Sequence, residues 1–197
     1  MNCEMVTGPE ALPVTVEELR RHSWEIFERE AAGDDTFFGE LLARATAHVE
    51  TMTSRKLVSQ TWRGYLDAWP KRGEVIELPF GRVTEITRFH WLGDDGVDHV
   101  MTAAVDYVAS LAGYFPKVVA LGSWPSGSLF PVDPIRVEFV DGFGDAAAVP
   151  ADLKQAILLC ASAWYRNRES YRVSGYAVSP LPQSFDHLIG PWRIVGV

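Results

Sequence analysis

The spacing of apolar residues changes twice along this chain, and that change limits the folds it can adopt. Apolar side chains recur every three or four residues up to about residue 54, alternate from Val58 onward, and return to helical spacing after Pro150. A period near 3.6 predicts amphipathic helices, whereas a period of two predicts strands with one buried face. We therefore predict an α+β fold, a single domain of helical-bundle type with an inserted antiparallel β-module and an extended C-terminal tail.

The N-terminal part, residues 15–56, is predicted to be a helical hairpin. Thr15-Val-Glu-Glu18 matches a capping box, in which the threonine hydroxyl accepts a hydrogen bond from the third helical amide and the glutamate reaches back. It predicts a first helix over about 16–31, and helical spacing predicts a second over about 36–54. A connection this short makes the two helices antiparallel. Residues 1–14 show little periodicity and are expected to form a loose arm.

The central segment, residues 57–143, is predicted to be the β insertion. Gly93-Asp-Asp-Gly96 has the composition of a hairpin turn. The strands predicted from alternation and from turn residues lie at 62–69, 74–78, 83–92, 97–101, 107–108, 117–121 and 135–140.

A third helix, 149–170, and a tail, 171–197, complete the chain. The helix carries an unbroken apolar stripe that includes Cys160, which is expected to be a small core residue. The tail contains prolines that exclude a long helix, yet it is too apolar for a disordered segment in solvent. It either packs on its own domain or folds onto a partner, and these alternatives do not exclude one another.

Charge and composition exclude several classes of protein. With 18 basic and 26 acidic residues the net charge is -8, which argues against sequence-independent binding of nucleic acid. No apolar run approaches the roughly 18 residues of a membrane span, so no membrane association is expected. The first residues lack the features of a signal peptide, which favours a protein made and kept in a reducing cytosol. The two cysteines form no Cys-x-x-Cys pair that could bind zinc.

Acidic and histidine residues near the predicted hairpin turn are the best candidates for chemistry. They are His90, Asp94, Asp95, Asp98 and His99. A turn in solvent explains them, because only residues of matching parity share a face of a hairpin. The alternative is a metal-dependent enzyme that uses His90, Asp95 and His99. Asp141-Gly-Phe-Gly-Asp145 has too few ligands for calcium and predicts a turn with Asp145 near a helix start. A third alternative is a monomeric domain that binds a small ligand.

Several segments, taken in order, resemble one known family. Ile135-Arg-Val-Glu-Phe-Val-Asp-Gly-Phe-Gly-Asp145 and Leu188-Ile-Gly-Pro-Trp-Arg193 are two of them. The others lie at 15–22, 40–62, 77–86, 106–108, 149–158 and 164–169. Their order and spacing resemble the head–tail connector, or adaptor, proteins of tailed bacteriophages with HK97-like heads and of phage-derived gene transfer agents.

The resemblance implies a structural protein without catalytic residues or cofactors. It implies a ring of twelve copies in the neck of the particle, at the head–tail junction, below the portal. Such a ring joins the portal to stopper, head-completion or tail-terminator proteins and leaves an axial channel through which DNA passes without specific binding. The excess of acidic residues would then keep DNA from adhering if it faces the channel.

The resemblance also points to the C-terminal segment as the surface that binds the portal. The residues it suggests are Tyr176, Leu181, Phe185, Leu188, Ile189, Trp192 and Arg193. Aromatic anchors supply burial in such a contact, while prolines limit the entropic cost of ordering. On this view, deletion from about Ser174 onward leaves a folded domain that no longer binds the portal.

Overall fold

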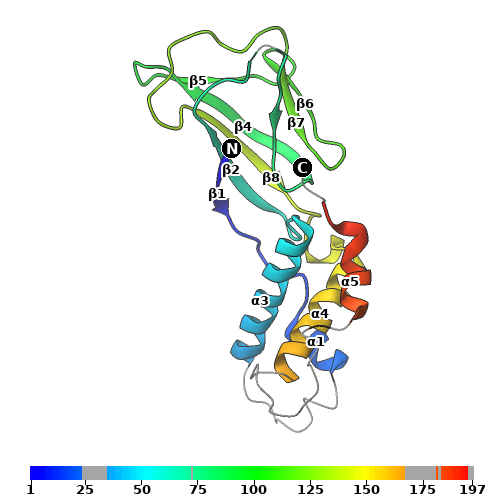
Figure 1. Cartoon of the computed structure of the whole chain (residues 1–197). Helices are drawn as coiled ribbons and strands as arrows, with labels where there is room; N and C mark the ends of the chain where they lie inside the picture. Colours follow the sequence, from blue (N-terminus) through cyan, green and yellow to red (C-terminus); the bar gives the residue numbers. More distant parts are fainter. Residues whose placement is uncertain (24–34, 72, 167–180, 182, 195–197) are drawn as a thin grey trace, which may run out of the picture. The chain divides into compact units, whose positions relative to one another are not determined.

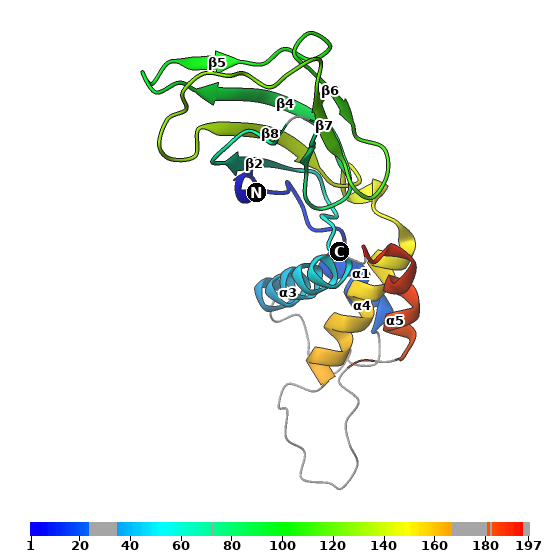
Figure 2. The same ribbon diagram turned by 45° about the horizontal axis from the view of Figure 1, so that its top comes forward.

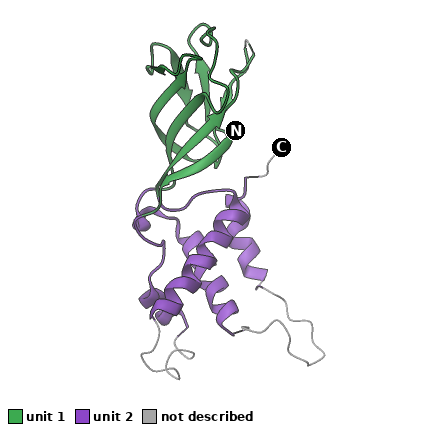
Figure 3. Cartoon of the chain, turned by 90° about the vertical axis from the view of Figure 1, so that its left-hand side faces the viewer, with its two compact units in different colours: residues 1–9, 59–143 green, residues 10–58, 144–197 purple. Residues whose placement is uncertain are grey.

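The computed structural model describes residues 1–23, 35–71, 73–166, 181 and 183–194. The chain divides into two compact units, shown in different colours in Figure 3. The first, called here the β unit, comprises residues 1–9 and 59–143; the second, the helical unit, comprises residues 10–58 and 144–197. No helix within the described part of the chain combines the length and apolar character needed to cross a membrane.

The larger sheet of the β unit has five antiparallel strands (Figure 1). In spatial order they are β1 (Asn2–Thr7), β2 (Gln60–Leu66), β8 (Ile135–Asp141), β4 (Val83–Leu92) and β5 (Asp98–Val100). The strand predicted at 83–92 is found with those limits, and the one predicted at 62–69 begins earlier and ends at Leu66. Register places Trp62 opposite Phe139, and Phe89 opposite Val137. Large apolar side chains therefore meet on one face of the sheet.

A second, smaller sheet contributes to the same core. Its strands, in spatial order, are β3 (Ile76–Glu77), β7 (Lys117–Ala120) and β6 (Tyr107–Ser110). Ile76, Tyr107 and Val118 from this sheet belong to one buried cluster with Phe89 and Phe139. Burial from both sheets stabilises the β unit by the hydrophobic effect.

Charges of alternating sign cross the other face of the five-stranded sheet. Glu4 on β1 lies opposite Arg63 on β2, and Arg63 lies opposite Glu138 on β8. Arg88 on β4, the other neighbour of β8, also lies opposite Glu138. Arg63 binds Glu138 at 2.8 Å, and Arg88 binds Asp98 at 2.7 Å. Cross-strand pairs of opposite charge suit a sheet face that meets water.

The first residues of the chain correct one prediction. They were expected to form a loose arm, but Asn2–Thr7 form β1, an edge strand paired with β2. The strand is open to solvent at every position except the half-buried Cys3, so it shows no alternation of apolar and polar residues. Its pairing depends on residues distant in sequence, which local periodicity does not report.

The helical unit contains four α-helices among the residues described. They are α1 (Val16–His22), α3 (Asp35–Thr53), α4 (Ala151–Arg166) and α5 (Gln183–Ile189). Helices α1, α3 and α5 all contact α4. Cys160 is completely buried on α4, and this burial raises the pKa of its thiol to about 12. Its predicted role as a core residue is confirmed.

Helix α1 starts as predicted but ends early. The Thr15 side chain accepts a hydrogen bond from the Glu18 amide at 3.2 Å, and the Glu18 carboxylate accepts one from the Thr15 amide at 2.7 Å. The helix ends at His22, with Ser23 as its C-cap, rather than near residue 31. The Ser23 hydroxyl shares a buried hydrogen bond of 2.7 Å with Ser162 of α4. The predicted short connection to α3 lies outside the described residues.

Replacing Thr15 with alanine tests this capping box. We expect a loss of about 1 kcal/mol in the free energy of unfolding, because the Glu18 amide loses its acceptor. Chemical denaturation followed by circular dichroism measures it. Thr51→Ala is the matched control, since Thr51 is exposed within α3 and alanine favours helix. Equal losses in both variants would contradict a specific role for the cap.

Candidate docking surface on the C-terminal segment

Residues 183–192 of the C-terminal segment form two short helices. Helix α5 is followed directly by the 3₁₀ helix η2 (Gly190–Trp192), and both belong to the helical unit (Figure 1). Pro191 lies at the start of η2, where its missing N–H and fixed φ are tolerated. Pro191 therefore fits the start of a short helix, and residues 183–192 are helical rather than extended.

One face of α5 belongs to the core of its own unit. Phe185 and Ile189 lie four positions apart in the sequence and are 2% and 0% exposed. The Phe185 ring stacks on His48 of α3 at 5.8 Å, and His48 lies 5.5 Å from Trp164 of α4. Helical spacing thus brings two apolar side chains against α3 and α4, and this part of the segment packs on its own chain.

The end of the segment is held at the C-terminus of α3. Arg55 is nearly buried, and its Nε donates a hydrogen bond of 2.7 Å to the Trp192 carbonyl oxygen. The Ile194 amide donates to the Thr53 carbonyl oxygen at 3.1 Å. The last carbonyls of a helix lack intrahelical partners, so a following segment can bind there without disrupting the helix.

The remaining suggested residues are less buried. Leu181, Leu188, Trp192 and Arg193 are intermediate in exposure, and Arg193 pairs with Asp186 at 2.9 Å. Tyr176 lies outside the described residues. The docking surface discussed below is therefore defined by the half-buried residues Leu188, Trp192 and Arg193.

The expectation that a chain cut at Ser174 keeps its fold needs correction. Such a cut removes Phe185 and Ile189, which are buried among the helices of the helical unit. It also removes the contacts with Arg55 and Thr53. Truncation would mix loss of folding with loss of docking, so point substitutions are the better test.

The histidine and aspartate cluster does not form a metal site. His90 pairs with Val100 and Trp91 pairs with His99, so the two histidines lie on opposite faces of the β4–β5 hairpin. The His99 ring stacks on Trp91 at 4.2 Å, and Asp95 accepts a hydrogen bond from the Val97 amide within the turn. Within the described ranges, no three His, Cys, Asp or Glu side chains are arranged to hold a metal ion.

His90 has a lower pKa than an ordinary histidine. Burial lowers its pKa below the ordinary value of 6.5, and the charge of Asp98 opposes this shift. We expect its imidazole resonance, assigned with a His90→Gln variant, to titrate below pH 6.5 by NMR. Because the folded protein then binds fewer protons than the unfolded chain, His90 should reduce stability as the pH falls below about 6.5. A midpoint above 6.5 would contradict this assignment.

The prediction that Asp145 lies near the start of a helix is confirmed. Asp145 is the N-cap of the 3₁₀ helix η1 (Ala146–Ala148), and its side chain accepts a hydrogen bond from the Ala148 amide at 2.9 Å. The carboxylate therefore has a structural role at a helix start.

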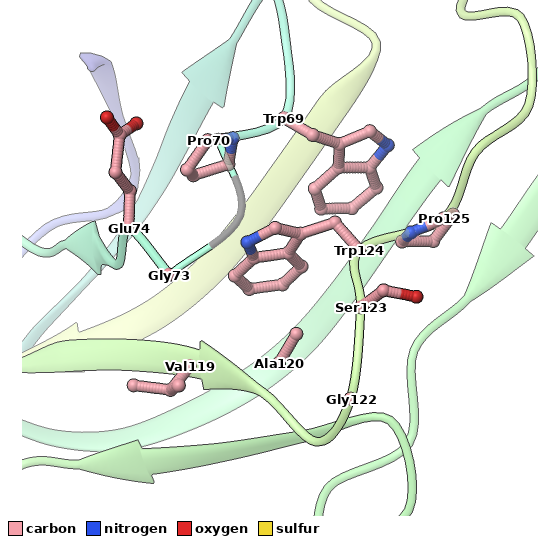
Figure 4. A pocket seen from close by; sticks show the side chains of 10 residues that line it. All are labelled: Trp69, Pro70, Gly73, Glu74, Val119, Ala120, Gly122, Ser123, Trp124 and Pro125. Carbon is pink, nitrogen blue, oxygen red and sulfur yellow. The ribbon is translucent and has the colours of Figure 1, made fainter.

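The β unit has an apolar pocket that the sequence does not signal. Trp69 and Trp124 stack at 5.1 Å with nearly parallel rings, and they line a cavity of about 300 Å³ (Figure 4). Pro70, Val119, Ala120 and Pro125 are among the other residues that line it. The two tryptophans are far apart in sequence and follow no common spacing, so only the fold brings them together.

Comparison with known proteins identifies the family. The comparison with curated protein sequences gives no match. A family model described as "Phage gp6-like head-tail connector protein" matches residues 94–193, which is just over half of the chain.

Solved structures similar to the whole chain come from gene transfer agent particles. One is titled "Virion of native gene transfer agent (GTA) particle", with a TM-score of 0.77 and 28% identity. Two others, at TM-score 0.75 and 28% identity, are titled "Neck of native GTA particle computed with C12 symmetry" and "Neck of empty GTA particle computed with C6 symmetry". Each alignment covers 100% of this chain and 97% of the other. This chain belongs to the phage gp6-like head-tail connector family.

Proposed function

We propose that this protein is a structural adaptor that forms a ring in the neck of a phage or gene transfer agent particle. The ring joins the portal to a stopper, head-completion or tail-terminator protein and surrounds a channel through which DNA passes. The observation that carries the proposal is the similarity, over the whole chain, to proteins from gene transfer agent necks. A neck with C12 symmetry supports twelve copies, because cyclic symmetry repeats one subunit around an axis.

The proposal includes no catalytic activity. The clearest candidate for chemistry was the cluster of His90, Asp95 and His99, and its two histidines lie on opposite faces of a hairpin. The one cysteine on a helix, Cys160, is completely buried, and its raised pKa makes it a poor nucleophile. A connector acts by contacts with other proteins, which requires surfaces rather than reactive groups.

Assembly on portal rings tests the adaptor function. Purified full-length protein is mixed with portal rings, and cryo-electron microscopy of the complex gives the copy number and position. A ring of this protein below the portal is the expected result. A protein that stays monomeric with and without portal, or that binds elsewhere, would refute the adaptor function.

We propose that the C-terminal segment binds the portal. Leu188, Trp192 and Arg193 would make contact, while Phe185 and Ile189 hold the segment against α3 and α4. Leu181, which is half-buried, would extend the same surface, and Tyr176, a further predicted contact, lies outside the described residues. Its composition supports this role, because tryptophan and arginine are enriched among the residues that contribute most to binding.

Replacing Trp192 with alanine tests this surface. We expect binding to portal rings to weaken about 30-fold, which corresponds to roughly 2 kcal/mol for a central aromatic anchor. The main-chain contact between Arg55 and the Trp192 carbonyl does not need the indole ring. His187→Ala is the matched control, since His187 is exposed on the same segment. Affinity for immobilised portal rings measures the effect, and equal affinities for both variants and the parent would locate the portal contact elsewhere.

We also propose that acidic side chains line the channel. The net charge of -8 supports this placement, because a negative wall repels DNA phosphates and lets the duplex slide. The same cryo-electron microscopy map of the ring would decide it. A predominantly basic wall would refute this placement.

A further inference from the structure

Exposed apolar side chains are concentrated in the β unit. Among the described residues, Met52 is the one exposed large hydrophobic that lies in the helical unit, and all the others lie in the β unit. Most belong to two sets, defined here. The β1 group consists of Met1, Met5 and Val6, and the hairpin group consists of Val105, Val108, Tyr114, Phe115, Val119 and Leu121. Exposed apolar side chains that gather on one element mark candidate interaction surfaces.

The β1 group lies on a sheet edge with little protection. Edge strands normally carry charges or proline that prevent pairing with other chains. In β1, Glu4 is the one charged residue, and Tyr65 donates a hydrogen bond of 2.7 Å to its carboxylate. The Met1 side chain occupies the space above Gly64 where a Cβ would otherwise lie. Met5, at 51% exposed, is the side chain best placed to reach another molecule.

The hairpin group lies on strands β6 and β7 and on the residues beside them. Val108 and Val119 lie opposite each other on β6 and β7, on the outer face, while Tyr107 and Val118 are buried on the inner face. Val119 also lines the pocket to which Trp69 and Trp124 contribute (Figure 4). A pocket beside an apolar face is the usual setting of an interface anchor.

The two groups combine apolar side chains with charges of opposite sign. Methionine is flexible and polarizable, and its sulfur makes favourable contacts with aromatic rings such as those of Trp69 and Trp124. Glu4 is the one charged residue of β1, and Lys117 is the one charged residue of β6 and β7. In Figure 2, β1 and the β6–β7 hairpin lie on different sides of the β unit.

We infer that these two groups form the contact between neighbouring copies of this chain. The β1 edge of one copy meets the outer face of the β6–β7 hairpin of the next, with Met5 in the neighbouring pocket that Val119, Trp69 and Trp124 help to line. The inference rests on the proposed ring, because cyclic assemblies of more than two copies require two different surfaces that bind each other. A subunit with two distinct apolar surfaces meets that requirement.

Two substitutions test the β1 group and the hairpin group separately. Met5→Lys removes the β1 half and Val108→Lys removes the hairpin half, and both sites are exposed, so folding should be retained and is checked by circular dichroism. We expect each variant to raise the protein concentration needed for rings by about tenfold or more, measured by mass photometry with portal rings present. Val132→Lys is the control, because Val132 is 62% exposed in the β unit but belongs to neither group.

Crosslinking decides whether the contact is between different surfaces. Met5→Cys and Val119→Cys are made separately in a Cys3→Ser background, purified and mixed under mild oxidation. Covalent dimers in the mixture, and not in either protein alone, are expected. Equal crosslinking of Met5→Cys with itself would overturn the inference, since it shows a symmetric contact.

The outcomes distinguish the inference from the proposed function. If the parent protein forms rings and both lysine variants form them equally well, the interface inference is wrong while the adaptor function stands. If Val132→Lys abolishes rings as effectively as the other two, the assignment to these two groups is also wrong. If the parent protein forms no ring even with portal present, the adaptor function itself fails.

Discussion

Replacing Phe185 with alanine is expected to lower the free energy of unfolding of the helical unit by about 3 to 5 kcal/mol. Phe185 is 2% exposed, and its ring stacks on His48 of α3. Alanine would leave a cavity between α3, α4 and α5 that the three helices cannot close completely. Urea denaturation followed by far-ultraviolet circular dichroism gives the change in free energy.

A matched substitution distinguishes this effect from a general loss of stability. Met52→Ala lies on α3 of the same unit, but Met52 is 38% exposed, so its replacement should change stability by no more than about 0.5 kcal/mol. If Phe185→Ala cost less than about 1 kcal/mol, α5 would not be part of the folded unit. The C-terminal segment would then be free to act as an independent tail.

The second large effect is expected in the β unit. Phe139 is completely buried in β8, opposite Trp62 on β2 and Ile86 on β4. Because it lies in the central strand of the five-stranded sheet, Phe139→Ala should cost about 3 to 5 kcal/mol. Hydrogen exchange measured by mass spectrometry should show faster exchange in β2, β4 and β8.

Phe130 provides the control for this substitution. It is 40% exposed in the segment between β7 and β8, so Phe130→Ala removes an aromatic ring from the same unit without opening a buried cavity. Its effect on stability should stay within about 0.5 kcal/mol. Equal losses for Phe139→Ala and Phe130→Ala would contradict the core described here.

Elements with strong local signals could be predicted from the sequence. The capping box at Thr15 and Glu18 located the start of α1, because both hydrogen bonds connect residues only three positions apart. Alternation predicted β4 from Val83 to Leu92, since this strand has one face toward the core. The apolar stripe around Cys160 predicted α4 for the same reason.

Elements that depend on distant partners could not be predicted. Strand β1 is exposed at every position except Cys3, so no alternation in residues 2–7 signals it, and it exists through pairing with β2. The end of α1 at His22 accompanies a hydrogen bond between Ser23 and Ser162. The pocket requires Trp69 and Trp124, which only the fold brings to 5.1 Å.

The proposed docking surface shows the same division. The sequence by itself determined that the C-terminal segment is apolar and interrupted by proline, and that the chain alternates between helical and strand periodicity; both follow from residue type and short-range spacing. Only the tertiary structure decided that Phe185 and Ile189 face the chain's own helices while Leu188, Trp192 and Arg193 stay partly exposed. Burial depends on which surfaces, distant in sequence, come into contact. A linear pattern of apolar residues is the same whether they pack against their own chain or bind another protein.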